Sequence, residues 1–331
     1  MAEEARVIPI DKNAAELCRG RTAGGRPCRN RAGASGYCKR HEGAARAAST
    51  PEERSRLETD LEQLLAFLRR RSTGDYAIDD FGFDADLTES VLIPMMRPLY
   101  DRWWRVEQKG LEHIPSEGAA LLVSNHSGTL PFDALMMKLG VFEGAGRHCR
   151  LLAADLALRL PLIGELARKS GNTLACEPDT VRLLDAGELV GVFPEGFKGI
   201  GKPFRERYKL QRFGRGGFVE MALRTGAPII PVSIIGAEEI YPIVANLKPL
   251  ARLLGFPYFP VTPTFPWLGL LGGIPLPSKW LIEYGEPIQT KPFGPDAAMD
   301  PMFLFNMTDQ VREGIQQMLY RNLMARRNVF F

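Results

Sequence analysis

The feature that most constrains the fold is a short apolar run that ends abruptly in polar residues. Residues Ala119 to Val123 are all apolar, and Ser124, Asn125 and His126 follow them. A run of this length with a polar boundary predicts a buried β-strand. Open α/β sheets carry their chemistry at the carboxyl ends of strands. His126 therefore stands where such a sheet would place a functional group.

A carboxylate follows His126 across a loop that contains Gly128 and Pro131. Asp133 opens a segment that is expected to be helical up to Leu139. A histidine with a carboxylate in reach is the smallest set of groups that takes a proton from a hydroxyl. The alternative is an ordinary loop histidine beside a helix-starting aspartate.

A second polar loop follows a second predicted strand. Residues 189–193 are expected to form a buried strand, and Pro194, Glu195 and Gly196 come directly after it. By itself, Phe-Pro-Glu-Gly is typical of a strand-end turn. Further strands are expected at residues 149–154, 171–176, 229–234 and 280–284, and a C-terminal helix at 301–327. Two polar loops at two strand ends indicate an α/β sheet with one active edge.

The composition is that of a folded protein. Of the 331 residues, 45% are hydrophobic and 24% are charged, which excludes a disordered chain and allows one large domain with an appendage. The net charge of +3 indicates no class of partner by itself.

Together, the two polar loops resemble the glycerolipid acyltransferase superfamily of the 1-acylglycerol-3-phosphate and glycerol-3-phosphate type. Its members carry an Asn-His…Asp block and a Phe-Pro-Glu-Gly block in this order. The segments Pro161-Leu162-Ile163-Gly164, Arg168-Lys169-Ser170-Gly171 and Pro228-Ile229-Ile230-Pro231-Val232 resemble its other blocks. The resemblance spans roughly Leu92 to Arg327. Six residues separate His126 from Asp133, against the usual four, which is similar to the monoacylglycerol acyltransferase branch.

The resemblance implies a fold and a reaction. The fold is a mixed, mostly parallel central sheet flanked by helices, formed by residues 88–331. The reaction is transfer of a fatty acyl group from acyl-CoA, or from acyl carrier protein, to a glycerolipid or related lipid hydroxyl. His126 would be the general base and Asp133 would orient it. The chain has no Gly-x-Ser-x-Gly elbow, so no covalent enzyme intermediate is expected.

The resemblance also implies a set of substrate-binding residues. Glu195 matches the acceptor-binding glutamate, and Lys198 stands where the family commonly has an arginine that holds the acceptor phosphate. Lysine lacks the bidentate fork of arginine, so a neutral acceptor lipid without a phosphate remains an alternative. The basic residues that follow bind phosphate groups or form a solvated basic face. The full set is Asn125, Ser127, Gly128, Phe193, Pro194, Glu195, Gly196, Lys198, Lys202 and Arg205.

Two apolar segments bear on where the protein works. Residues 91–106 carry Trp and Arg, and residues 248–279 carry many aromatic and leucine residues between Pro and Gly. Each segment either packs on the core or meets a lipid interface. The second segment would be a buried flap in the first case and an acyl-chain tunnel that dips into the interface in the second. No apolar run reaches the ~20 residues that span a bilayer, and no signal peptide precedes the first charges. We expect a peripheral protein on the cytoplasmic face of a membrane, with the lipid surface as its partner.

The N-terminal region carries a different signal. After a lead-in at residues 1–17, the segment 18–42 holds Cys18, Cys28, Cys38 and His41, a full tetrahedral set for structural zinc. The spacing resembles small three-Cys-one-His zinc modules. The alternative is a group of incidental thiols. The basic residues of segment 18–42 suit binding to anionic lipid or, less well, to nucleic acid, and we favour a docking role for this segment. Residues 43–87 are a linker and a helix that begins at Pro51.

Three other functions fit parts of this pattern. The domain could bind lipid without turnover, because the spacing of His126 and Asp133 is altered. The zinc module could make the protein a nucleic-acid-linked regulator, whose binding would depend steeply on salt. The same site could also hydrolyse thioesters, releasing product without an acceptor.

Overall fold

The structure, a computed structural model, describes residues 28, 30, 38 and 51–330. The chain divides into two units, residues 1–66 and 67–331. The long helix α2 (Pro51–Thr73) begins in the first unit and ends in the second, and it starts at the expected proline. Within the second unit, Arg71 pairs with Asp84 at 2.5 Å.

A seven-stranded sheet organises the second unit. Its spatial order is β1-β9-β6-β2-β5-β3-β4. Every neighbouring pair is parallel except β6 and β9, which are antiparallel. The strands are β1 (Glu107–Lys109), β2 (Ala120–Ser124), β3 (Cys149–Ala153), β4 (Thr173–Leu174), β5 (Leu189–Val192), β6 (Ile229–Ile235) and β9 (Leu281–Tyr284). The expected mixed, mostly parallel sheet is confirmed.

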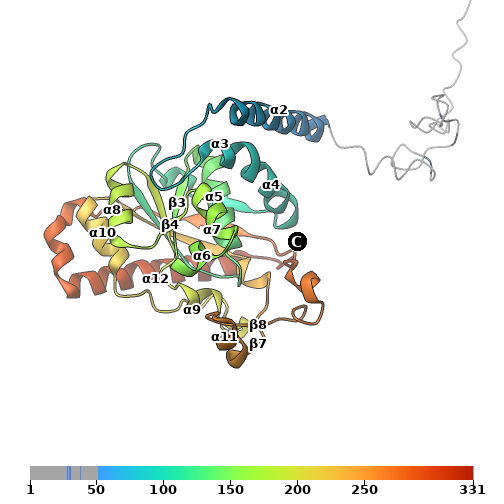
Figure 1. The fold of residues 1–331 in the computed structure, drawn as a ribbon. Helices are drawn as coiled ribbons and strands as arrows, with labels where there is room; N and C mark the ends of the chain where they lie inside the picture. The colour runs from blue at the N-terminus through green and yellow to red at the C-terminus, as the bar shows by residue number, and fades with distance from the viewer. Residues whose placement is uncertain (1–27, 29, 31–37, 39–50, 331) are drawn as a thin grey trace, which may run out of the picture. The chain divides into compact units, whose positions relative to one another are not determined.

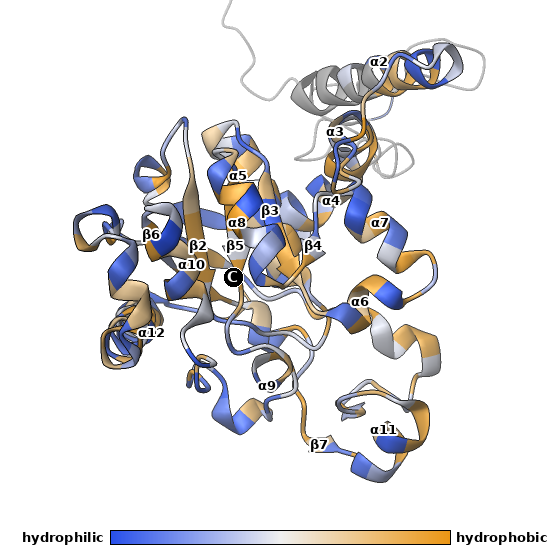
Figure 2. Ribbon diagram, turned by 60° about the vertical axis from the view of Figure 1, so that its left-hand side comes forward, coloured by the Kyte–Doolittle hydropathy of each residue, from blue (hydrophilic) through white to orange (hydrophobic). Residues whose placement is uncertain are grey.

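Helices cover both faces of the sheet. Along β2, Ala120 and Leu122 belong to one core cluster, and Leu121 and Val123 to another on the opposite face. Strands buried on both faces explain why β2 is a continuous apolar run. Figure 2 shows apolar residues concentrated along the central strands and α5. The α-helices after α2 are α3 (Ala85–Leu87), α4 (Ile93–Pro98), α5 (Phe132–Ala145), α6 (Asp155–Arg159), α7 (Ile163–Lys169), α8 (Glu177–Asp185), α9 (Phe197–Ile200), α10 (Gly217–Thr225), α11 (Lys248–Leu254) and α12 (Pro301–Ala325).

The aromatic segment 91–106 packs largely on the core. Trp104 is fully buried and stacks on Trp280, with ring centroids 4.7 Å apart. Ile93 and Tyr100 are buried as well, whereas Met95 is 62% exposed. The core-packing alternative therefore describes most of this segment.

The second apolar segment forms a small separate lobe. Between β6 and β9 the chain makes β7 (Ala245–Asn246), α11 and β8 (Pro260–Val261), with β7 and β8 paired antiparallel. A short helical turn follows at Gly269–Gly273. In Figure 1 this lobe projects below the sheet, next to α9. Within the described ranges, every helix is too short or too polar to traverse a bilayer.

Candidate active site

His126 and Asp133 meet at the carboxyl end of β2. The Nδ1 of His126 lies 2.7 Å from Oδ2 of Asp133. Asp133 is fully buried in the first turn of α5. Its two oxygens also accept the backbone N–H groups of Ser127 and Ala134, both at 2.8 Å. These three contacts fix the carboxylate against the imidazole.

The loop between the two residues closes through left-handed turns. Gly128 has φ +90° and Thr129 has φ +62°. A Cβ on Gly128 would lie 2.9 Å from the carbonyl oxygen of Ala237, so only glycine fits there. The backbone N–H of Phe132 then donates to Leu130 at 2.7 Å. A six-residue spacing thus brings His126 to Asp133 by tight local turns.

The contact with Asp133 sets the chemistry of the imidazole. A carboxylate only accepts hydrogen bonds, so Nδ1 of His126 carries the proton and donates it. The lone pair is then on Nε2, which makes that nitrogen the proton acceptor. The His126 side chain is 14% exposed. The centroid of the Phe193 ring, directly before the second polar loop, lies 4.6 Å from the centroid of the imidazole. The imidazole is therefore partly shielded from water but accessible.

Glu195 is buried and holds two loops by their backbones. One carboxylate oxygen accepts the N–H of His126 at 2.9 Å, and the other accepts the N–H of Gln211 at 2.6 Å. The residue is only 4% exposed. The resemblance assigns acceptor binding to Glu195, but in this structure its oxygens support the backbone beneath His126.

A buried cation lies beside this glutamate. The Nζ of Lys202 is 3.7 Å from Glu195 and 3.0 Å from Glu238. It also donates to the carbonyl of Lys209 at 3.2 Å. Burial raises the pKa of Glu238 to about 7, although Lys202 and the N–H of Tyr208 act in the opposite direction. Lys202, predicted to bind substrate, is thus paired with buried groups inside the protein, and its side chain is only 1% exposed.

Asn125 is also turned away from the site. Its Nδ2 donates to the carbonyl of Ile234 at 3.0 Å, and its Oδ1 accepts the N–H of Ile234 at 2.8 Å. The amide thereby extends the pairing of β2 with β6 by one step. Asn125, expected among the substrate-binding residues, therefore fixes the strand end from which His126 projects.

Two hydroxyl groups in the loop between His126 and Asp133, which we call the His126 loop, are candidates for contact with a substrate. The Oγ of Ser127 and the Oγ1 of Thr129 are buried and have no hydrogen-bond partner among the described residues. Ser127 was predicted as a site residue, whereas Thr129 was not. A buried unpaired hydroxyl is costly, which makes such groups candidates for contact with a substrate.

The remaining predicted residues surround the second loop. Pro194 is half-buried, and Gly196, with φ +52°, turns the chain into α9. Lys198 lies exposed on α9. The side chain of Arg205 is 85% exposed and lies 3.7 Å from Glu206. The structure leaves Lys198 and the side chain of Arg205 at the surface.

An apolar pocket of about 380 Å³ opens beside the His126 loop. The hydroxyl of Tyr258 donates to the carbonyl of Thr129, which ties the lobe to the loop. Burial raises the pKa of Tyr258, with a smaller contribution from Asp133. The pocket is lined by Thr129, Leu130, Leu156, Ala157, Leu160, Phe197, Tyr241, residues 256–260, Thr262, Phe265, Gly272 and Gly273. Tyr258 has no local sequence signal, because the contact joins distant parts of the chain.

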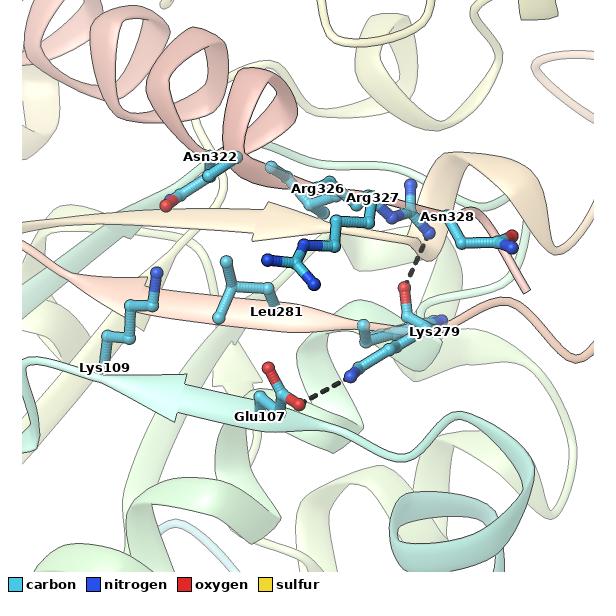
Figure 3. Close-up of a pocket in the computed structure, with 11 residues that line it drawn as sticks. Glu107, Lys109, Lys279, Leu281, Asn322, Arg326, Arg327 and Asn328 are labelled. Carbon is cyan, nitrogen blue, oxygen red and sulfur yellow. Dashed lines mark hydrogen bonds and ion pairs between the residues drawn. The ribbon is translucent and has the colours of Figure 1, made fainter. Parts of the chain in front are cut away.

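A more polar pocket of about 280 Å³ lies where β1, β9 and the end of α12 meet. Figure 3 shows Lys109, Arg326 and Arg327 around it, with Glu107 paired to Lys279 at 2.6 Å. It shares no lining residue with the apolar pocket and contains none of the predicted site residues.

Two of the four proposed zinc ligands lie within the described residues. Cys28 and Cys38 are buried, and their Sγ atoms are 4.0 Å apart. That separation is too long for a disulfide and is close to the edge of a ZnS₄-type tetrahedron with Zn–S bonds of ~2.3 Å. The Nδ2 of Asn30 lies 3.6 Å from Sγ of Cys38. Cys18 and His41 fall outside the described residues, and no group of three or more potential ligands occurs within them.

Comparisons with known proteins separate the two parts of the chain. Residues 105–235 match the family model described as Acyltransferase, and residues 15–52 match a domain of unknown function (DUF5763). An uncharacterized protein of Mycobacterium tuberculosis (strain ATCC 25618 / H37Rv) is 56% identical over 297 residues, 88% of this chain and 82% of that protein. A second, from Mycobacterium leprae (strain TN), is 55% identical over 279 residues, 84% of this chain and 76% of that protein.

Other proteins are similar at lower identity. The "DGAT1/2-independent enzyme synthesizing storage lipids" of Homo sapiens is 27% identical over 194 residues, 57% of this chain and 56% of that protein. The crystal structure of the 1-acyl-sn-glycerophosphate (LPA) acyltransferase PlsC from Thermotoga maritima aligns with a TM-score of 0.47 and 18% identity, over 82% of this chain and 99% of that one. On the identity and coverage of the mycobacterial relatives, this chain belongs to their family, and its residues 105–235 form an acyltransferase-family domain.

Proposed function

We propose that this protein transfers a fatty acyl group from an acyl thioester to the hydroxyl of a glycerolipid or related lipid. The observation that carries the proposal is the 2.7 Å contact between Nδ1 of His126 and the buried carboxylate of Asp133, beside an apolar pocket. The acyltransferase-family match over residues 105–235 supports the reaction class. The donor is acyl-CoA or acyl carrier protein.

The geometry suits general-base catalysis. Nε2 of His126 takes the proton of the lipid hydroxyl while that oxygen attacks the thioester carbonyl. Asp133 stabilises the imidazolium that forms. When the tetrahedral intermediate collapses, the C–S bond breaks and the proton on Nε2 passes to the leaving thiolate. The proton thus ends on the thiol and the acyl group on the lipid oxygen, without a covalent enzyme intermediate.

The apolar pocket suits the acyl chain. Its walls are almost entirely aliphatic and aromatic, which favours burial of methylene groups over polar head groups. Thr129 belongs both to the His126 loop and to the lining of the pocket. A chain bound there has its carbonyl end beside His126, where the unpaired hydroxyls of Ser127 and Thr129 are positioned to donate to the oxyanion or the head group.

The other predicted groups take secondary roles in this proposal. Lys198 and Arg205 are exposed cations near the second loop and attract a phosphate on the acceptor or the donor. Zinc held by Cys18, Cys28, Cys38 and His41 supplies folding energy to the N-terminal segment, which docks the enzyme on the cytoplasmic face of a membrane. Nucleic acid is the less favoured partner of that segment.

The test is acyl transfer from labelled acyl-CoA to a panel of lipid hydroxyls. We expect transfer by the wild type, loss of transfer in His126→Ala, and full transfer in His148→Ala, which removes a histidine paired with Glu89 instead. Release of free fatty acid without an acceptor would identify a thioester hydrolase. Lipid binding without turnover in any condition would identify a scaffold. Salt-dependent binding of DNA or RNA by the full chain, with no acyl transfer, would favour the regulator.

A further inference from the structure

We propose that the lobe of residues 245–274, with the turn between α6 and α7, inserts into the interfacial layer of an anionic phospholipid bilayer. This rests on the proposed function and deepens it, because it names the surface through which the site receives lipid. We call these residues the apolar lobe and the α6–α7 turn.

The apolar lobe exposes large side chains that soluble proteins normally bury. Leu270 is 99% exposed, Leu253 81% and Trp267 72%, and Leu162 in the α6–α7 turn is 84% exposed. Large apolar side chains that are exposed together in one small lobe mark it as a candidate interaction surface. Their neighbours add to the patch: Leu247, Leu254, Phe256, Leu268, Leu271, Ile274 and Ile163.

The charge around this patch favours an anionic bilayer as its occupant. Residues 240–282 contain no Asp or Glu, whereas Lys248 and Arg252 lie exposed on α11. Lysine and arginine beside leucine and tryptophan are the combination that binds anionic lipid head groups and the hydrocarbon boundary together. A second copy of this lobe would bring cations against cations, so self-association does not match the charge.

The patch adjoins the apolar pocket beside the His126 loop, because Phe256 belongs to the patch and also lines the pocket. This pocket is lined by Leu156 of α6 and by Leu160 just after that helix, together with Phe256 and Phe265 of the apolar lobe. Figure 2 shows α6, α7 and α11 on the same side of the molecule and apolar residues in the α6–α7 turn. Insertion of the lobe therefore puts the pocket at the bilayer, and an acyl chain enters it without crossing water.

The test is binding of the full chain to vesicles. The vesicles contain equal amounts of phosphatidylcholine and phosphatidylglycerol. We expect Leu253→Glu/Leu270→Glu to weaken partitioning about tenfold or more, because each change puts a carboxylate into the interfacial layer. Met324→Glu, on α12, is the matched control: Met324 is 89% exposed but outside the lobe, and the variant should bind like the wild type. Both sites are solvent-exposed, so the variants should fold, which circular dichroism verifies.

Two further measurements sharpen the outcome. Bromine-labelled lipid should quench the fluorescence of the wild type more than that of Trp267→Phe, since Trp267 is 72% exposed in the lobe, whereas Trp104 and Trp280 are fully buried and Trp103, outside the lobe, is 38% exposed. Lys248→Glu/Arg252→Glu should reduce binding to the mixed vesicles more than to phosphatidylcholine alone. Equal vesicle binding by wild type and Leu253→Glu/Leu270→Glu would overturn the proposal. So would a wild-type dimer that this double variant converts to a monomer, because a second copy would then cover the patch.

Activity on a water-soluble short-chain acceptor and donor separates this proposal from the proposed function. The lobe variants should retain that activity while losing activity on vesicle-borne lipid. If the wild type transfers no acyl group to either acceptor, the proposed function fails whatever the vesicle result. If the wild type transfers acyl groups to both acceptors and the lobe variants are as active as the wild type on vesicle-borne lipid, the insertion of the lobe is refuted and the proposed function stands.

Discussion

The carboxylate of Glu195 accepts the backbone N–H of His126 at 2.9 Å, so the loop after β5 sets the position of the loop after β2. The two strands are parallel neighbours in the sheet, which brings their carboxyl ends together. The other oxygen of Glu195 accepts the backbone N–H of Gln211, and Glu195 itself is buried. A residue that resemblance assigns to the acceptor is, in this structure, part of the support under the imidazole.

Replacing Glu195 by glutamine should therefore lower kcat more than it raises KM. One of the two backbone N–H groups would face an amide N–H instead of an oxygen, which shifts the His126 loop. A shift of this kind costs catalysis by about 10–100-fold, and the unpaired N–H costs about 1–3 kcal/mol of stability. Steady-state kinetics and urea unfolding measure the two effects. A raised KM with unchanged kcat would instead assign Glu195 to acceptor binding.

Asp133→Asn should leave the fold nearly intact and reduce kcat by about 10³-fold or more, because an amide stabilises the imidazolium poorly and can favour the wrong tautomer. The asparagine oxygen can still accept the N–H of Ser127 or Ala134. Single-turnover acyl transfer with matched thermal unfolding checks this expectation. Transfer at the wild-type rate would show that His126 does not need its carboxylate.

Asn125→Ala should destabilise the protein by about 2–4 kcal/mol, since it leaves both the N–H and the carbonyl of Ile234 buried and unpaired. Urea denaturation measures the loss of free energy of unfolding. Ser72→Ala, whose hydroxyl donates only to an exposed backbone carbonyl of Arg69, is a control that should change little. A neutral effect of Asn125→Ala would mean that water replaces the amide at the strand end.

Glu238 should make the stability depend on pH. Its pKa is raised by burial from 4.5 to about 7, so between these values the folded state holds a proton that the unfolded state releases. The free energy of unfolding then falls as the pH rises through this window, by as much as about 3 kcal/mol at 1.36 kcal/mol per pKa unit. Glu238→Gln should flatten the decline, as thermal unfolding between pH 5 and pH 8 would show. The same slope in both proteins would place the titration elsewhere.

The purified chain should contain about one zinc ion, held by its three N-terminal cysteines and one histidine. Cys28→Ser and Cys38→Ser should each lose most of the metal, whereas Cys176→Ser, in the half-buried loop before α8, should retain it. Elemental analysis after gel filtration measures the content. Equal metal in all four proteins, or none in the wild type, would contradict the zinc module.

The sequence by itself determined the frame of the site. Buried parallel strands are continuous apolar runs, so β2 and β5 were visible, and so were the polar residues at their ends. The break between α6 and α7 follows from Pro161, as expected from a residue that cannot continue a helix. In contrast, β1 is Glu-Gln-Lys at the edge of the sheet, and no apolar pattern marks it.

Only the tertiary structure decided which way each polar atom faces. Nothing local to Glu195, Lys202 or Asn125 distinguishes a carboxylate, ammonium or amide that meets substrate from one that pairs with a distant backbone. Their partners, Gln211, Glu238 and Ile234, lie on other elements. Tyr258 reaches Thr129 only because the lobe folds back over the His126 loop. Periodicity and turn residues report local structure, whereas hydrogen bonds between distant segments depend on how the sheet and its loops pack.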